Sequence, residues 1–108
     1  MEDGTAFFGK DGQGRIYING NNATIYSPYF DKTNNPQGMK INLNDANIYM
    51  KYSGNTIKLD AGETRSVSNF NNMSNAPFTI GTKFAVAWDG TIYATGGNFK
   101  GTISASVL

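Results

Sequence analysis

The amino-acid sequence predicts an all-β protein built from short strands and hairpins. Asn, Gly, Thr and Ser together make up 44 of the 108 residues, and Asn and Gly readily take the positive-φ corners of tight turns. The chain has nine Ile, seven Phe and six Tyr but only two Glu and three Leu, a balance that favours pleated, half-buried strands over helices. No window of eleven or more residues shows a helical period.

Apolar and polar residues alternate in several short segments, each of which ends at Gly, Asn or Asp. These segments are residues 16–18, 39–43, 48–52, 57–60, 84–88 and 92–94. The three segments between residues 39 and 60 are separated by short turns, so they predict a β-meander. Phe84, Val86 and Trp88 are expected on one face of a strand, and Phe99 and Ile103 are expected to close the chain.

Two parts joined by a polar connection are predicted along the chain. Residues 1–62 form the N-terminal hairpin and meander part, residues 63–76 form an Asn-rich connection, and residues 77–108 form the C-terminal β part. Residues 11–25 and 89–103 share an order of Asp-Gly, Ile-Tyr, a Gly/Asn corner and Thr-Ile, which suggests a hairpin unit able to stack on copies of itself.

The composition excludes several functional classes. The chain has no Cys and no His and a formal net charge of +1, so disulfides, thiolate-ligated metals and Ser-His-Asp or Cys-His catalysis are ruled out. The near-neutral charge predicts no nucleic-acid partner, and no apolar run predicts insertion into a membrane. We therefore expect no enzyme, no cofactor and no metal site.

The small core predicts self-association. The alternating positions supply only about 20 inward-pointing apolar side chains, several of them Ala, and short hairpins are unstable alone and expose unpaired strand edges. Intertwining identical chains would cover both the apolar faces and the edges. The expected state is an obligate homo-oligomer.

Two regions resemble a known protein family. Residues 77–103 read PFTIGTKFAVAWDGTIYATGGNFKGTI, and residues 38–43 and 55–61 read GMKINL and NTIKLDA. The regions that contain these segments, residues 38–61 and 77–104, make up about half of the chain and resemble parts of the minor structural, tail-fibre and tail-associated proteins of phages and prophages that infect Gram-positive bacteria. The C-terminal segment is the more specific of the two regions, because the other is partly plain strand alternation.

The resemblance implies a function and an assembly. It implies a homotrimeric, intertwined fibre or spike segment that acts as a structural module of a phage tail fibre or tail tip and contributes to host-surface attachment. The location would be the virion, after synthesis in the bacterial cytoplasm, and the partners would be copies of itself, other tail proteins and host cell-surface polysaccharide. Proteins of this family are usually several times longer than this chain, and no catalytic residue belongs to the matching motifs.

Aromatic residues are the candidate binding residues. Tyr26, Tyr29 and Phe30 lie near a Pro-containing loop, whereas Tyr49 and Tyr93, like Tyr17, are expected on strand faces opposite the aliphatic residues. Tyr rings pack against sugar rings and bring a hydroxyl group, which favours a saccharide-binding face. Tyr is also enriched at interfaces between chains, and the sequence leaves both interpretations open.

Other polar groups have weaker functional interpretations. The loop from Asp31 to Gly38 offers oxygen ligands for Ca²⁺ but lacks the EF-hand spacing. The carboxylates of Asp45, Asp60 and Glu63 could form a glycosidase acid/base pair. The Asp-Gly pairs at 11–12 and 89–90 are typical of tight turns, and the glycines at 12, 14, 96 and 97 lack the Lys-Ser/Thr of a phosphate loop. The alternatives to a tail module are thus a carbohydrate-binding receptor-recognition module and a glycan-cleaving tail-spike domain.

Overall fold

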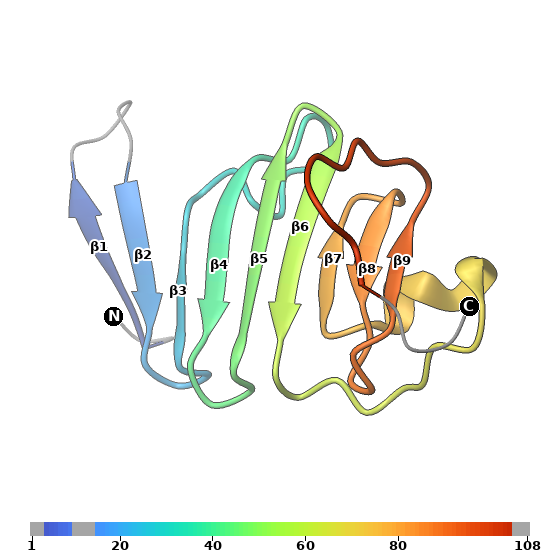
Figure 1. Ribbon diagram of the computed structural model, residues 1–108. Helices are drawn as coiled ribbons and strands as arrows, with labels where there is room; N and C mark the ends of the chain where they lie inside the picture. The colour runs from blue at the N-terminus through green and yellow to red at the C-terminus, as the bar shows by residue number, and fades with distance from the viewer. Residues whose placement is uncertain (1–3, 10–14, 105–108) are drawn as a thin grey trace.

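A computed structural model describes residues 4–9 and 15–104, and these residues form one antiparallel β-sheet (Figure 1). Each strand pairs with the next along the chain, so the order in the sheet is the order in the sequence. The strands are β1 (Thr5–Gly9), β2 (Arg15–Asn19), β3 (Thr24–Tyr26), β4 (Gly38–Asn42), β5 (Asn47–Tyr52), β6 (Asn55–Asp60), β7 (Phe78–Ile80), β8 (Phe84–Val86) and β9 (Ile92–Ala94). The all-β prediction and the meander between residues 39 and 60 are confirmed.

The structure also differs from the predicted elements. The strands β1, β3 and β7 were not predicted. β3 and β7 have only three residues and, unlike the equally short β8 and β9, they are not beside a longer alternating run or an Asp-Gly turn. Phe99 and Ile103 lie outside any strand, so the expected closing strand is wrong. Trp88 lies beyond the end of β8 and not on its face.

The connection between β6 and β7 contains a 3₁₀-helix, η1 (Phe70–Asn75). Its start is capped by two Asn side chains: Asn69 accepts the Asn71 N–H at 2.8 Å, and Asn72 accepts the Asn69 N–H at 3.1 Å. These reciprocal bonds explain why an Asn-rich segment forms an ordered turn of helix. The sheet continues across the connection because β6 pairs directly with β7.

One face of the sheet, here called the apolar face, carries an unbroken row of apolar side chains. The register places one residue of this central row on every strand, each directly opposite the next. The row consists of Ala6, Ile18, Ile25, Ile41, Ile48, Leu59, Phe78, Val86 and Ile92. A second, shorter row lies beside it, consisting of Met39, Met50, Ile57, Ile80, Phe84 and Ala94.

The opposite face, here called the polar face, carries a row of mixed chemistry. In strand order this row is Phe7, Tyr17, Tyr26, Lys40, Tyr49, Lys58, Thr79, Ala85 and Tyr93. Successive side chains of a strand point to opposite faces, so Tyr17, Tyr49 and Tyr93 lie opposite the aliphatic residues, as the sequence predicts.

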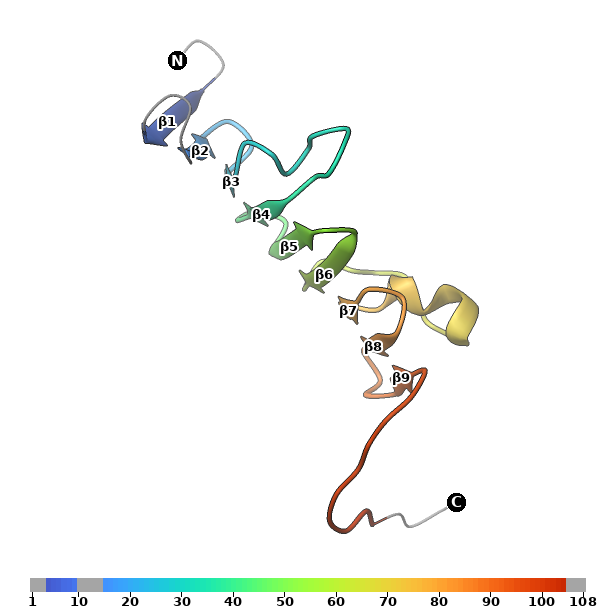
Figure 2. The ribbon, with the colours of Figure 1, turned by 90° about the horizontal axis from the view of Figure 1, so that it is seen from above.

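The excursions from the sheet cover its polar face. The 27–37 loop and the connection with η1 project to the same side of the sheet (Figure 2). On that side Met73 and Ala76 pack with Ala85 of β8, and the ring of Phe30 lies 4.3 Å from the Lys51 ammonium group. The core is therefore small and lies on the polar face, while the apolar face is covered by no strand or helix of the described residues and is bordered at its β8–β9 end by residues 96–99.

The molecule is extended for its size. Its Cα radius of gyration is 17.6 Å and its extents are 58 × 26 × 25 Å, whereas a compact domain of this length has a radius of about 13 Å. Its accessible surface is 8069 Å², against about 5900 Å² for a compact monomer of this mass. A single-layered sheet explains both excesses, because one of its faces stays open.

Candidate functional site

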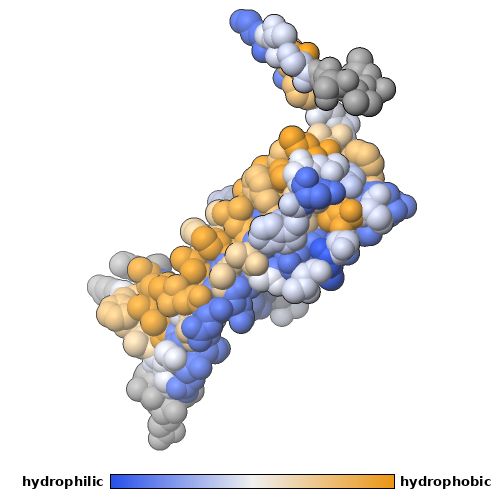
Figure 3. Space-filling model, turned by 60° about the horizontal axis from the view of Figure 1, so that its bottom comes forward, coloured by the Kyte–Doolittle hydropathy of each residue, from blue (hydrophilic) through white to orange (hydrophobic). Residues whose placement is uncertain are grey.

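The apolar face is the largest candidate site on the molecule. Hydrophobic residues form a band along one side of the molecule (Figure 3). Several of them are well exposed, including Leu59 at 43%, Ile80 at 44% and Ile92 at 63%. Monomeric proteins rarely expose apolar patches of this extent unless the patch binds something. The arrangement is that of a sheet lacking the second layer that normally buries it.

The apolar face has a shallow hollow near the ends of the central strands. It has a volume of about 460 Å³. Its apolar lining includes Ile41, Leu43, Ile48, Leu59, Phe78 and Trp88. Three of these residues belong to β4, β5 and β6, and Leu43 follows β4 with 60% of its surface exposed. The hollow suits side chains of an apposed protein surface, because its walls offer mainly dispersion contacts and few hydrogen bonds.

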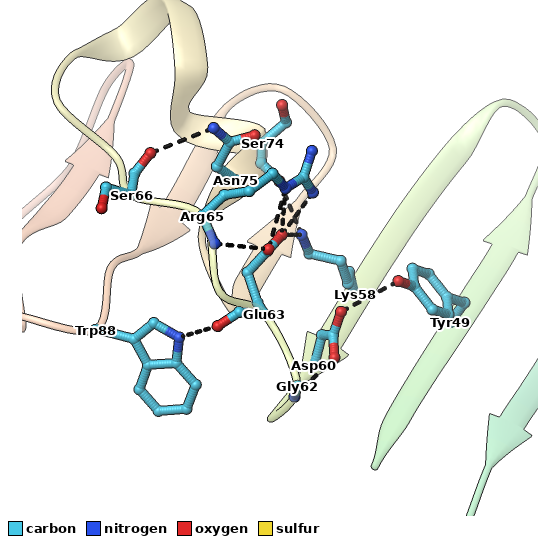
Figure 4. A network of polar contacts seen from close by, with 10 residues as sticks. All are labelled: Tyr49, Lys58, Asp60, Gly62, Glu63, Arg65, Ser66, Ser74, Asn75 and Trp88. Atoms are coloured by element: carbon cyan, nitrogen blue, oxygen red, sulfur yellow. Dashed lines mark hydrogen bonds and ion pairs between the residues drawn. The ribbon is translucent and has the colours of Figure 1, made fainter. Parts of the chain in front are cut away.

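A network of charges on the polar face holds the connection against the sheet (Figure 4). Lys58 of β6 is 7% exposed and donates to Glu63 Oε1 at 3.2 Å and to the Ser74 carbonyl oxygen at 2.8 Å. Arg65 donates to the same carboxylate through Nε and Nη2. The hydrogen bonds from Arg65, with those from Lys58, lower the pKa of Glu63 to about 2. Glu63 is thus a fixed anion at neutral pH.

Asp60 and Glu63, two of the carboxylates considered for an acid/base pair, make hydrogen bonds within the chain. Asp60 accepts the Gly62 N–H at 2.9 Å and the Tyr49 hydroxyl at 3.4 Å. Burial, together with the charge of Asp60, raises the pKa of Tyr49. Glu63 holds no proton near neutral pH, so it cannot act as a general acid. Both side chains hold the beginning of the connection in place: Asp60 bonds Gly62, and Glu63 bonds Lys58 of β6.

The five candidate aromatic residues do not converge on one site. Tyr26 contacts Tyr17 edge-on at 5.3 Å between ring centroids, on the half of the sheet near the N-terminus. Tyr93 contacts Phe70 edge-on at 5.4 Å and packs against the small core at the other end. Tyr49 lies between them, and its hydroxyl group donates a hydrogen bond to Asp60.

The exposure of Tyr29 and Phe30 differs sharply, although they are neighbours. Phe30 is only 5% exposed, so its ring lies inside the described chain and not at its surface. It is buried because the loop turns its ring onto the polar face, under the Lys51 side chain. Tyr29 is 55% exposed, with the Lys32 ammonium group 5.3 Å from its ring.

The remaining predicted polar features are turns and surface pairs. Asp31 pairs with Lys40 at 3.5 Å, and within residues 4–9 and 15–104 no three acidic, His or Cys side chains gather to hold a metal ion. Asp89 accepts the Thr91 N–H at 2.9 Å, which lowers the pKa of Asp89, and Gly90 has a φ of 86°. This Asp-Gly pair is therefore a turn, whereas residues 11–14 lie outside the described residues.

The sequence did not single out Trp88 as a site residue. Its side chain is 61% exposed, and its Nε1 donates to the Glu63 carbonyl oxygen at 2.9 Å. It borders both the hollow on the apolar face and a second hollow of about 190 Å³, which the 64–67 segment lines. Two features of the sequence could have identified it: Trp88 is the single Trp of the chain, and it precedes an Asp-Gly turn.

Among the helices of the described chain, none has the length and apolar character needed to cross a bilayer. The sequence matches no protein-family model, no curated protein and no solved structure.

Proposed function

We propose that this chain is a structural module of a phage tail fibre or tail-tip protein, which acts by packing its apolar face against the same face of identical chains. The observation that carries the proposal is the central row, which is apolar on all nine strands and is covered by no other strand or helix of the described residues. The resemblance of residues 38–61 and 77–103 to tail proteins supports the assignment of the chain to a phage tail.

Copies of the chain suit this face better than an unrelated partner does. The central row crosses nine strands, a distance of about 38 Å at 4.8 Å per strand, and a second copy presents a row of the same length and chemistry. The surface of 8069 Å² exceeds that of a compact monomer by about 2200 Å². A surplus of that order per chain is what obligate assemblies bury.

A trimer is the proposed assembly, in line with the resemblance. The strands have three to six residues, so the apolar face is narrow and only about two rows wide. In a closed triangle of three sheets, each sheet directs its apolar face to the centre and meets both neighbours along its length. The polar faces, with the loop and η1, then face solvent.

The rows also define the axis of the proposed fibre. They run across the strands, in the direction in which the nine strands follow one another along the length of the molecule (Figure 2). Three chains packed row against row therefore lie parallel, with their strands transverse to the fibre. Other tail proteins and host cell-surface polysaccharide are the further partners, and the virion is the location.

Solution mass tests the proposal, with light scattering behind a sizing column. We expect the mass of three chains for the natural sequence. Leu59→Lys places a charge in the central row and should reduce the mass to that of one chain. Thr56→Lys adds the same side chain to the polar face of the same strand and should leave the trimer intact.

Two results would contradict the proposal. A folded monomer of the natural sequence at micromolar concentration would favour a free-standing carbohydrate-binding module. Equal loss of mass in both variants would show that the apolar face is not the contact surface. A glycan-cleaving domain would instead require turnover of cell-wall polysaccharide that is lost in Asp60→Asn.

A further inference from the structure

We propose that the second hollow beside Trp88 is a binding subsite for one ring of a neutral oligosaccharide. It has a volume of about 190 Å³, enough for a single sugar ring. It is lined by Thr64, Arg65, Ser66, Val67, Pro77, Ala87, Trp88 and Asp89. None of the five aromatic residues considered above belongs to it. The proposal deepens the proposed function and rests on it, because it assigns to a named place on this chain the contact with cell-surface polysaccharide.

The indole of Trp88 is the platform of the subsite. An aromatic ring binds the flat C–H face of a sugar by dispersion and by attraction to its π-electrons, and it needs an exposed ring face to do so. Trp88 is 61% exposed. It lies in the turn between β8 and β9 and projects toward Glu63 (Figure 4). Its only polar atom is already satisfied by the Glu63 carbonyl oxygen at 2.9 Å.

The indole is held in place before any ligand arrives. The carbonyl group that it bonds belongs to Glu63, whose carboxylate is anchored by Lys58 and Arg65. Lys58 in turn is buried and tied to the Ser74 carbonyl oxygen. A ring fixed through this chain of bonds loses little conformational entropy when it binds a ligand.

The rim of the hollow offers the hydrogen-bonding groups that sugar hydroxyls need. Thr64 and Ser66 contribute hydroxyl groups that both donate and accept. Arg65 also lines the hollow, but its guanidinium bonds the Glu63 carboxylate on the side of Glu63 away from Trp88 (Figure 4). The Asp89 carboxylate is engaged by Thr91 in its own turn. The groups left for a ligand are therefore the neutral hydroxyl groups of Thr64 and Ser66 and the face of the indole, which favour a neutral ligand over a charged one.

The subsite is compatible with the proposed assembly. The segment of residues 64–67 follows Glu63, which pairs with Lys58 on the polar face. Residues 64–67 and Asp89 line the second hollow but not the hollow on the apolar face, whereas Trp88 and Pro77 border both hollows. A neighbouring chain can cover one side of the indole while the other side remains open to a sugar.

The fluorescence of the single Trp gives a direct test. The full chain is titrated with three neutral pentasaccharides (cellopentaose, chitopentaose and maltopentaose), and binding is measured in parallel by calorimetry. We expect at least one of them to quench or shift the Trp88 emission saturably. Trp88→Ala should remove the calorimetric signal, and Thr64→Val and Ser66→Ala should each weaken binding about 5- to 10-fold, because each deletes one hydroxyl group and its hydrogen bond.

Matched controls separate the subsite from the rest of the molecule. Tyr29→Ala removes another exposed aromatic ring and should leave the affinity unchanged. Leu59→Lys, which is expected to dissociate the trimer, should still bind the same sugar, so a failed assembly and a failed subsite give different results. The solution mass of each variant is measured alongside.

Three results would each overturn the subsite. The first is the absence of a saturable signal with all three sugars. The second is unchanged affinity in Trp88→Ala. The third is Trp88 emission that acrylamide does not quench in the trimer, which would place the indole between chains.

Discussion

Lys58 shows at the scale of a single residue how the polar face is held together. It lies in the middle of a strand, between Tyr49 and Thr79 on the neighbouring strands. Its side chain is nearly buried, and its ammonium group bonds one carboxylate and one carbonyl group of the connection. A buried charge remains in place only when such partners replace its water. Lys58 therefore joins β6 to the connection.

The first prediction concerns the removal of this charge. Lys58→Met should lower the free energy of unfolding by about 3 kcal/mol, because it leaves the buried Glu63 carboxylate with one partner fewer. Lys40→Met is the matched control, since Lys40 lies in the same row but pairs with the exposed Asp31, and it should cost less than about 1 kcal/mol. Urea unfolding at fixed protein concentration measures both, and equal losses would contradict a special role for Lys58.

The second prediction concerns acid. The pKa of Glu63 falls from an ordinary 4.5 to about 2 in the folded chain, so the unfolded chain takes up a proton first as the pH falls. The stability contributed by Glu63 is fully present above pH 4.5 and is lost between pH 4.5 and about 2. Melting temperatures measured across that window should fall more steeply for the natural chain than for Glu63→Gln. Parallel curves would show that Glu63 does not control this loss.

At the scale of elements, the loop and the connection are excursions of a plain meander that fold back on one face. The 27–37 loop begins after β3 and returns to β4 at Gly38, whose φ is 110°. A Cβ built on Gly38 would lie 1.8 Å from Ser27 Oγ, at the base of the loop. The path of the loop onto the polar face, with Phe30 buried beneath it, thus depends on the absence of a side chain at this corner.

The third prediction tests this corner. Gly38→Ala should destabilise the chain by about 3 kcal/mol, since it combines backbone strain with a steric clash. Gly54→Ala should cost about 1 kcal/mol from strain alone, because Gly54 also has a positive φ but nothing lies within 4 Å of its built Cβ. Thermal unfolding of the two variants measures the difference. A Gly54 variant as unstable as the Gly38 variant would show that the contact with Ser27 is unimportant.

At the scale of the whole molecule, the sheet has cover on one side only. The few buried hydrophobic residues among those described are Phe30, Met73, Ala76, Ala85 and Ala87. Three of these five are Ala, so their burial contributes little to stability. The larger apolar residues lie on the open face. The stability of the molecule therefore depends on what covers that face.

The fourth prediction follows from this dependence. If copies of the chain cover the apolar face, folding is coupled to association, and the melting temperature should rise as the protein concentration rises. Small-angle scattering should give a maximum dimension near the 58 Å extent of one chain together with the mass of three. A melting temperature independent of concentration, or a particle several chains long, would contradict parallel packing.

The sequence by itself determined the strand period and the faces of the sheet. Alternation is a local property, because successive side chains of a strand point to opposite sides. The meander between residues 39 and 60 and the placement of Tyr17, Tyr49 and Tyr93 opposite the aliphatic residues followed from it. Strands of three residues carry few positions for this signal. β8 and β9 were predicted because the alternation continues to Trp88 and an Asp-Gly turn follows, whereas β3 and β7 lack such neighbours.

Only the tertiary structure decided which side chains are buried and which meet. Phe30 is buried while Tyr29 is exposed, and the polarity of the two neighbours does not predict the difference. Lys58 bonds Ser74 across sixteen positions, and Trp88 bonds Glu63 across twenty-five. Such contacts depend on where the loop and the connection fold over the sheet. That path is set by the summed packing of distant residues, and no short stretch of sequence encodes it.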